Sequence, residues 1–241
     1  MVSLVLDGQG LVRLGHQRGL PAAADDMGYL VHCVLGELFG DLAPAPFLVR
    51  PQEGRGFPVL GYGSASARHL QEVAQETAAP DLWATCDWES LASKPMPGTF
   101  AAGAEYAFST RVCPVVRMAK ADTRHRKGAE VDAFLRRCWQ VGDGVAVSRE
   151  EVYRDWLKED LERHGGAELV NVGLTGFNRA RLVRRGRKSG QRPVRVSERP
   201  DATLDGVLKV TDPDRFSALL ARGVGRHRGF GFGMLLLRRR G

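Results

Sequence analysis

The stretch that most restricts the fold is residues 223–233, where five of eleven residues are glycine and an apolar run follows at residues 234–237. Glycine adopts positive φ without steric cost, so this stretch predicts a tight loop leading into a strand. One interpretation is an ordinary turn and bulge before a C-terminal strand. The other is a loop whose bare backbone approaches a polyanion while Arg226, His227 and Arg228 supply hydrogen-bond donors. The regular spacing of the glycines favours the second interpretation.

The charged residues are divided unevenly along the chain. Residues 1–110 contain 6 Lys or Arg and 12 Asp or Glu, whereas residues 111–241 contain 29 and 16. The net charge of +7 is therefore made of an acidic half at −6 and a basic half at +13. This division indicates a basic face that binds a polyanion.

No apolar segment approaches the roughly 20 residues that a membrane-spanning helix requires, so we expect no membrane partner. Residues 1–7 lack the basic region of a signal peptide and indicate a strand. The cysteines, at positions 33, 86, 113 and 138, form no Cys-x-x-Cys pair. Their spacing favours buried thiols in a reducing cytoplasm over disulfides or a zinc site.

The first half of the chain alternates between strand-like and helix-like segments. The predicted strands are residues 1–7, 10–15, 47–50, 57–62 and 82–86, and the predicted helices are residues 27–39 and 65–78. Asp25 and Asp26 are candidate N-caps of the first helix. This order is the β-α-β-β-α-β pattern of a ferredoxin-like domain.

The second half repeats the same order with longer insertions. Its predicted elements are a strand at 106–118 interrupted by Pro114, helices at 130–138 and 149–164, strands at 168–182 and 204–210, and a helix at 213–221. We therefore expect an α+β protein of two tandem ferredoxin-like, RRM-like domains, residues 1–95 and 99–241, joined near residues 93–98.

One side of the predicted helix at 27–39 carries two functional groups. The apolar residues of this helix form one stripe at helical spacing, and Tyr29 and His32 lie one turn apart on the opposite face. Gly36 leaves open space beside them. An exposed histidine without a role is the plain alternative, and the Tyr-x-x-His spacing alone does not exclude it.

The predicted helix at 149–164 is rich in acidic residues, which are the residue type that binds the metal ion of a metal-dependent nuclease. Basic residues interleave with them at helical spacing, which favours an ion-paired, solvated face instead.

Residues 177–200 contain nine Lys or Arg and one acidic residue, Glu198. Strand-like segments flank this run and Gly190 lies near its middle, so it predicts a basic β-hairpin arm rather than a disordered tail. A two-stranded ribbon can follow a nucleic-acid groove and place arginines on phosphates. The candidate RNA-binding residues here are Arg184, Arg185, Arg187, Lys188, Arg192 and Arg195.

Together, these features resemble the repeat-associated mysterious protein superfamily, and within it the CRISPR repeat-cleaving endoribonucleases. The signature of that family, Gly-hydrophobic-Gly, five residues, Gly-hydrophobic-Gly, is matched by residues 223–233 at every required position. Tyr29 and His32, together with residues 197–200 (Ser-Glu-Arg-Pro), resemble the CasE subgroup of type I systems. The resemblance covers nearly the whole chain.

This resemblance implies metal-independent cleavage of precursor CRISPR RNA at the 3′ base of the repeat stem, with no cofactor. The 2′-hydroxyl attacks the adjacent phosphorus and leaves a 2′,3′-cyclic phosphate. His32 is the candidate general base or acid, with Tyr29 orienting the imidazole or the ribose. The glycine loop is the candidate RNA-binding surface beneath the RNA. Its candidate residues are Gly223, Gly225, Arg226, His227, Arg228, Gly231 and Gly233. The implied partners are the repeat stem-loop or guide RNA and the other Cascade subunits.

Two alternatives stay open at this stage. One is a non-catalytic RNA-binding subunit of a CRISPR complex. The other is an unrelated RRM-type module that stacks bases on Phe177, Phe230 or Phe232.

Overall fold

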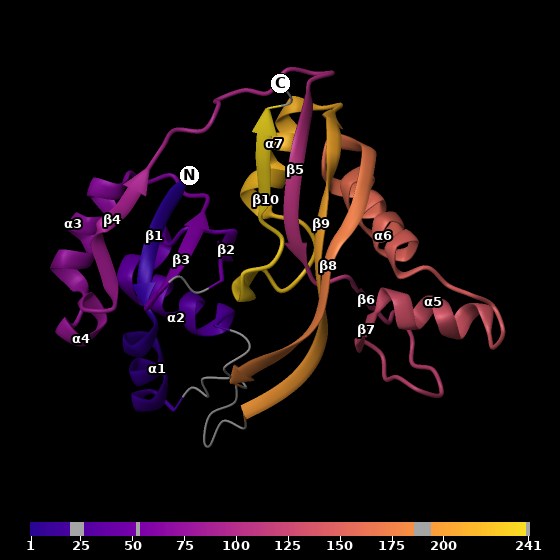
Figure 1. Cartoon of the computed structure of the whole chain (residues 1–241), viewed down its shortest axis with the longest axis horizontal. Helices are drawn as coiled ribbons and strands as arrows, with labels where there is room; N and C mark the ends of the chain where they lie inside the picture. The colour runs from indigo at the N-terminus through magenta and orange to yellow at the C-terminus, as the bar shows by residue number, and fades with distance from the viewer. Residues whose placement is uncertain (20–26, 52–53, 186–193, 240–241) are drawn as a thin grey trace.

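The computed structural model describes residues 1–19, 27–51, 54–185 and 194–239. Within these residues the chain forms two antiparallel four-stranded sheets and a small two-stranded ribbon. Figure 1 shows the first sheet with its helices at the left and the second sheet at the right. The two sheets lie in the two halves of the sequence, as the repeated element order predicts.

The first unit has the β-α-β-β-α-β order with short additional helices. Its elements are β1 (Val2–Asp7), α1 (Gly8–Gln17), α2 (Gly28–Phe39), η1 (Gly40–Leu42), β2 (Phe47–Val49), β3 (Gly56–Gly61), α3 (Ala67–Thr77), α4 (Pro80–Trp83) and β4 (Cys86–Ser93). The strand order is β2-β3-β1-β4, and β1 is antiparallel to both of its neighbours. The predicted ferredoxin-like topology is thereby confirmed for this half.

The second unit repeats this topology around a long insertion. Its elements are β5 (Glu105–Val112), β6 (Val115–Arg117), β7 (Glu130–Asp132), α5 (Ala133–Val141), α6 (Arg149–His164), β8 (Ala167–Arg185), β9 (Val194–Val210), α7 (Pro213–Arg222), η2 (Arg228–Phe230) and β10 (Leu235–Arg239). The strand order β10-β5-β9-β8 is the counterpart of the first sheet, with β6 and β7 pairing separately as the ribbon. The predicted domain boundary falls in the connection between β4 and β5.

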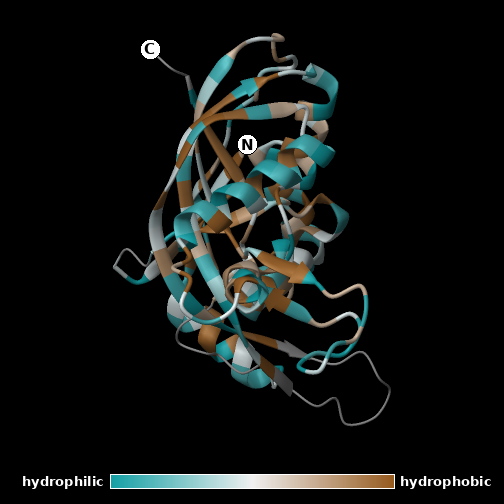
Figure 2. Ribbon diagram, turned by 90° about the vertical axis from the view of Figure 1, so that its right-hand side faces the viewer, coloured by the Kyte–Doolittle hydropathy of each residue, from teal (hydrophilic) through white to brown (hydrophobic). Residues whose placement is uncertain are grey.

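Each unit has its own apolar core, and the two cores meet along the β2-β3 edge of the first sheet. The stripe of α2 packs into the first core, where Val31 and Val34 are fully buried. Leu48 and Leu60, from β2 and β3, pack against the core of the second unit. Figure 2 shows hydrophobic residues running through the strands and hydrophilic residues on the helices nearest the viewer.

The predicted strand at 10–15 is wrong, because these residues belong to α1. The carboxylate of Asp7 accepts a hydrogen bond from the backbone N–H of Gly10, which caps the helix at its N-terminus. Leu11 and Leu14, one turn apart, are then buried in the first core. Glycine-rich sequence concealed the helical spacing of these two leucines.

The predicted strand at 82–86 is also wrong. Pro80 begins the short helix α4 instead, and the hydroxyl of Thr85 donates to the carbonyl of Leu82 at 2.6 Å before β4 starts at Cys86. The candidate caps Asp25 and Asp26 lie outside the described residues. The described N-cap of α2 is Met27, which makes no side-chain cap hydrogen bond.

The predicted helix at 130–138 starts too early. Residues Glu130–Asp132 form β7, and the side chain of Asp132 accepts from the backbone N–H of Phe134 at 2.8 Å to cap α5. The interruption expected at Pro114 is confirmed, because it separates β5 from β6.

The predicted basic hairpin is a two-stranded arm. Strands β8 and β9 pair from Ala167 with Val210 to Arg185 with Val194, whereas β5 pairs with β9 only up to Ala202. The part of the hairpin beyond that point extends past the sheet, as the long orange strands of Figure 1 show. Arg184, Arg185 and Arg195 lie in the strands of this arm, whereas Arg187, Lys188 and Arg192 lie outside the described residues.

Four acidic residues of α6 make ion pairs, as the alternation of charges predicts. The pairs are Arg154 with Asp155, Lys158 with Glu162, Arg163 with Glu159, and Arg222 with Asp160. No helix in the described part of the chain is long and apolar enough to cross a membrane.

Candidate active site

His32 lies on the exposed face of α2, whereas Tyr29, one turn away, also packs against the first core. The His32 side chain is exposed and that of Tyr29 is half-buried, and their ring centroids are 6.3 Å apart. The imidazole ring is parallel to the ring of Phe47, with centroids 6.5 Å apart. The apolar stripe of α2 therefore directs the histidine outward, as the sequence predicts.

The glycines of the two Gly-hydrophobic-Gly triplets are required by the backbone. Gly223, Gly225, Gly231 and Gly233 have φ values of 77°, 65°, 78° and 84°, in the region that a residue with a Cβ disfavours. The triplets lie side by side, because the N–H of Val224 donates to the carbonyl of Gly233 at 2.8 Å. A Cβ on Gly233 would lie 2.2 Å from the carbonyl oxygen of Val224. The glycine loop, residues 223–233, is thus a tightly folded turn, as the sequence predicts.

The remaining glycine of this loop, Gly229, lies beside the histidine. A Cβ on Gly229 would lie 3.6 Å from Nε2 and Cδ2 of His32, in ordinary van der Waals contact. The next residue, Phe230, stacks on Tyr29 with ring centroids 5.3 Å apart. The structure thereby brings together the helix and the glycine loop, which are nearly 200 residues apart in sequence.

The basic arm also reaches this position. Ala180 and Leu182 of β8 are buried in a small third cluster with Phe230, Phe232 and Cys113, and Tyr29 packs against it. The helix, the glycine loop and the base of the arm therefore share one apolar contact. This contact sets where His32 stands relative to the arm.

A groove of about 920 Å³ opens beside His32 and the glycine loop. Arg226, His227 and Arg228, predicted from the sequence, line this groove. Its other basic residues, which we did not predict, are Arg117, Arg136, Arg163, His164 and Arg222. These residues belong to the basic half of the sequence. They lie on four different elements, β6, α5, α6 and α7, and form no sequence motif.

Glu130 of β7 is an acidic residue at the centre of these basic groups. Its carboxylate accepts from Nε of Arg226 at 2.6 Å and lies 2.9 Å from Nε2 of His227 and 3.6 Å from Nη2 of Arg199. The hydrogen bond with His227, followed by that with Arg226, lowers the pKa of Glu130 to about 2, against an opposing effect of burial. Glu130 is therefore ionised at neutral pH.

Desolvation disfavours the charged form of an imidazole as it does that of a carboxylate, which lowers the pKa of a histidine. Although the His32 side chain reaches solvent, neighbouring atoms partly desolvate its ring and lower the pKa of His32 below its ordinary value. The imidazole is accordingly neutral at neutral pH, which is the form that can accept a proton.

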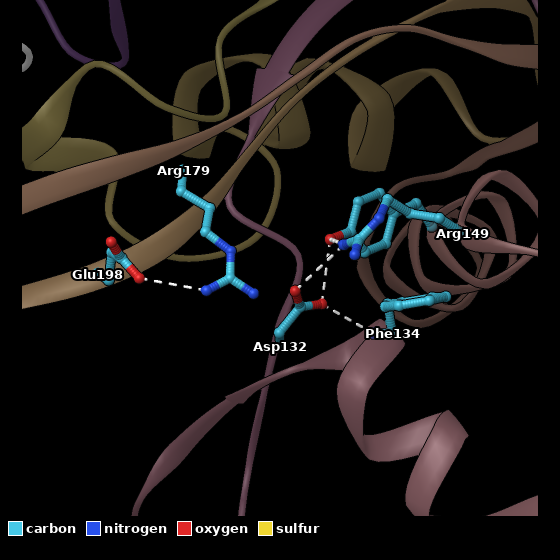
Figure 3. Close-up of polar contacts among 6 residues, drawn as sticks. Asp132, Phe134, Arg149, Arg179 and Glu198 are labelled. Carbon is cyan, nitrogen blue, oxygen red and sulfur yellow. Dashed lines mark hydrogen bonds and ion pairs between the residues drawn. The ribbon is translucent and has the colours of Figure 1, made fainter. Parts of the chain in front are cut away.

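The β6-β7 ribbon is fixed to α6 by a buried polar cluster, which Figure 3 shows together with the Arg179–Glu198 ion pair of the arm. Asp132 accepts from the hydroxyl of Tyr153 at 3.0 Å and pairs with Arg149 at 3.3 Å. The guanidinium of Arg149 stacks over the ring of Phe134, 3.9 Å from its centroid. Glu130 therefore stands on a supported strand.

Two other hollows lie elsewhere, one of about 800 Å³ beside residues 93–98 and one of about 490 Å³ between the sheets. Neither His32 nor the glycine loop is among the described residues that line them. The candidate site is assigned to the groove by its chemistry, since a histidine, a glycine loop and clustered arginines meet there.

A tandem pair of ferredoxin-like units, with a basic arm and a glycine loop seated against a histidine, defines the structural class of this protein. A family profile described as "CRISPR associated protein" matches residues 12–239, and the chain belongs to that family. A search of curated proteins finds no significant match.

Solved structures of similar fold cover the whole chain. The structure of the CRISPR endoribonuclease Cse3 bound to a 19 nt RNA is 19% identical, with a TM-score of 0.59 over 98% of each chain. Thermus thermophilus Cse3, bound to an RNA representing a pre-cleavage complex, is 21% identical, with a TM-score of 0.57 over 98% of this chain and 97% of that one. A chain of a CRISPR RNA-guided surveillance complex is 14% identical, with a TM-score of 0.55 over all of both chains.

Proposed function

We propose that this protein is an endoribonuclease that cleaves precursor CRISPR RNA at the 3′ base of the repeat stem-loop. The observation that carries the proposal is the position of His32 beside Gly229 of the glycine loop, at the edge of an arginine-lined groove. Family membership and the similar fold of RNA-bound Cse3 support it. The exposed imidazole favours an enzyme over a subunit that only binds RNA.

In the proposed reaction, the ribose 2′-oxygen attacks the adjacent phosphorus and the bond from phosphorus to the 5′-oxygen breaks. The products carry a 2′,3′-cyclic phosphate and a 5′-hydroxyl. His32, in its neutral form, removes the proton of the 2′-hydroxyl. A second group protonates the leaving 5′-oxygen, and cationic side chains stabilise the charge on the phosphorane.

Tyr29 orients the reacting groups in this proposal. Its ring is held between α2 and Phe230, so it links the position of the helix to that of the glycine loop. The arginines that line the groove beside His32 bind RNA phosphates. The basic arm follows the stem, where A-form geometry favours shape and phosphate contacts over readout of base edges.

We further propose that the cleaved guide RNA stays bound and that the protein acts within a type I Cascade complex. The similar fold of a subunit of a CRISPR RNA-guided surveillance complex supports this partner assignment.

The test is incubation of the protein with a stem-loop repeat RNA in EDTA, followed by analysis of the product ends. We expect a cyclic phosphate, and no cut when the attacking ribose lacks its 2′-hydroxyl. His32→Ala should abolish cleavage while RNA affinity stays within about tenfold, because an imidazole removed from the chemistry leaves the phosphate contacts in place.

A matched control is His69→Ala, which removes an exposed imidazole from α3. This variant should cleave like the unaltered protein. Tight RNA binding by the unaltered protein without any cleavage would overturn the proposed activity and establish the non-catalytic alternative. Cleavage that needs a divalent cation would contradict the metal-independent chemistry.

A further inference from the structure

Glu130 occupies an unusual position, because it is a carboxylate inside the groove that we propose binds RNA. Its side chain is 16% exposed and is surrounded by Arg226, His227 and Arg199. A negative charge here repels a polyanion, so by itself it weakens the proposed binding. Neighbouring arginines would bind RNA more strongly without it.

Glu130 contacts the glycine loop at His227, where the backbone has a conformation that is unusual for a residue other than glycine. His227 has φ of 63°, the left-handed region, and it is the only described non-glycine residue with positive φ. A residue with a Cβ disfavours this conformation unless its surroundings hold it there. The hydrogen bond between Nε2 of His227 and Glu130, together with the hydrogen bond from Arg226, holds two successive loop residues.

The residues that follow His227 carry this constraint to the catalytic helix. The N–H of Phe230 donates to the carbonyl of His227 at 2.8 Å, which closes the short helix η2. This turn places Gly229 against the imidazole of His32 and the ring of Phe230 on Tyr29. The path from Glu130 to His32 therefore runs through four consecutive residues of the loop.

We propose that Glu130 is a positioning residue, whose carboxylate holds Arg226 and His227 and thereby keeps the glycine loop seated against His32 in the arrangement needed for cleavage. This inference rests on the proposed function. Glu130 is not itself the general acid, because its pKa of about 2 leaves it without a proton at neutral pH.

The test compares Glu130→Gln with the unaltered protein, using the stem-loop repeat RNA that the unaltered protein cleaves. The single-turnover cleavage rate at saturating protein should fall about tenfold or more, since a small misplacement of a catalytic group is costly. The dissociation constant for RNA should stay the same or improve up to about threefold, because a negative charge has left the groove.

Glu162→Gln is the matched control. Glu162 also lies on α6 and is ion-paired with Lys158 of the same helix, but it is outside the lining of the groove and makes no contact with the loop. This variant removes the same charge and should leave both the RNA affinity and the cleavage rate unchanged.

The outcomes separate the inference from its alternatives. Unchanged or faster cleavage by Glu130→Gln would overturn the positioning role and leave only charge repulsion. Parallel losses of affinity, cleavage and melting temperature would also overturn it, in favour of a purely structural role. If Glu130→Gln does not fold, Glu130→Asp keeps the charge but shortens its reach, and slower cleavage at unchanged affinity then supports the inference, whereas normal cleavage refutes it. Absence of cleavage by the unaltered protein would instead refute the proposed function.

Discussion

At the scale of single residues, the proton affinity of His32 determines the pH range in which the proposed reaction runs. Partial burial lowers the pKa of His32, so the neutral base persists to a lower pH than for a free imidazole, whose ordinary pKa is about 6.5. We predict that kcat/KM rises with pH through a midpoint below about 6.5. A rate that falls as pH rises through this range would make His32 the general acid.

Protein stability must be followed in the same pH series. A histidine with a lowered pKa in the folded state binds its proton more tightly when unfolded. Its contribution to stability is therefore lost as pH falls from about 6.5 through the folded-state pKa. Circular dichroism at each pH distinguishes loss of the base from loss of the fold.

The glycines of the loop differ in what they do, and this difference is testable. Gly233→Ala places a Cβ 2.2 Å from the carbonyl oxygen of Val224 at a φ of 84°. We predict a loss of about 1–3 kcal/mol or more in the free energy of unfolding. Gly229→Ala meets only the His32 ring at 3.6 Å, and its stability should change by less than about 0.5 kcal/mol.

Urea denaturation of both variants measures this difference. Equal destabilisation would show that the loop strains Gly229 as much as Gly233. A stable Gly233→Ala protein would contradict the backbone explanation of the signature.

The sequence could identify the loop and His32 but not every role within the site. The sequence predicts that the glycines let a polyanion approach, and the structure adds a backbone role: Gly223, Gly225, Gly231 and Gly233 all have positive φ, and Gly223 and Gly233 lie where two backbone segments pack together. Glu130 was missed because it falls in a predicted helix. Its partners lie about 70 and 97 residues away, and no local pattern reports contacts of that separation.

At the scale of elements, long periodic segments are the ones that sequence predicts well. The stripe of α2 and the alternating charges of α6 determine helices by themselves, and both are confirmed. The predictions for short elements failed, because single contacts determine where such elements begin and end. The side chain of Asp7 caps the start of α1, and the hydroxyl of Thr85 closes the turn after α4. Such contacts outweigh the weak intrinsic preference of a few residues.

The basic arm leads to a prediction about salt. Because β8 and β9 extend beyond the sheet, cationic residues of the arm have room to follow a phosphate backbone. Replacing Arg187, Lys188 and Arg192 with alanine should weaken RNA binding. The slope of log affinity against log salt should also become shallower by about 2 to 3, as expected for the loss of three phosphate contacts.

Titration of RNA binding at several salt concentrations measures this slope. Replacing Arg13, Arg68 and Lys94, which lie in the first unit outside the lining of the groove, is a control with the same loss of charge. An unchanged slope for the arm variant, or an equal change for the control, would contradict the proposed role of the arm.

At the scale of the whole molecule, the candidate site belongs to neither unit alone. His32 comes from the first unit, and the glycine loop and the arm come from the second. Element order predicts both folds, but it contains no information about how two ferredoxin-like units dock. That geometry depends on side chains such as Leu48 and Leu60, which leave the first sheet to pack on the second core.

A buried hydrogen bond connects the two units at this interface. The buried hydroxyl of Tyr62, which follows β3, donates to the carbonyl of Leu235 on β10 at 2.6 Å. Burial raises the pKa of Tyr62 to about 12, so it remains a donor over the working pH range. Tyr62→Phe leaves that carbonyl without its partner and should cost about 1–3 kcal/mol of stability.

Because His32 and Gly229 come from opposite sides of this interface, a looser interface should disturb cleavage more than binding. We predict that Tyr62→Phe slows cleavage several-fold, while RNA affinity changes by less than about threefold because the arginines that line the groove lie in the second unit. Tyr106→Phe, within the second unit, is the control for loss of a phenol hydroxyl. Normal cleavage by a destabilised Tyr62→Phe protein would mean that contacts within the glycine loop hold the histidine in place without help from the interface.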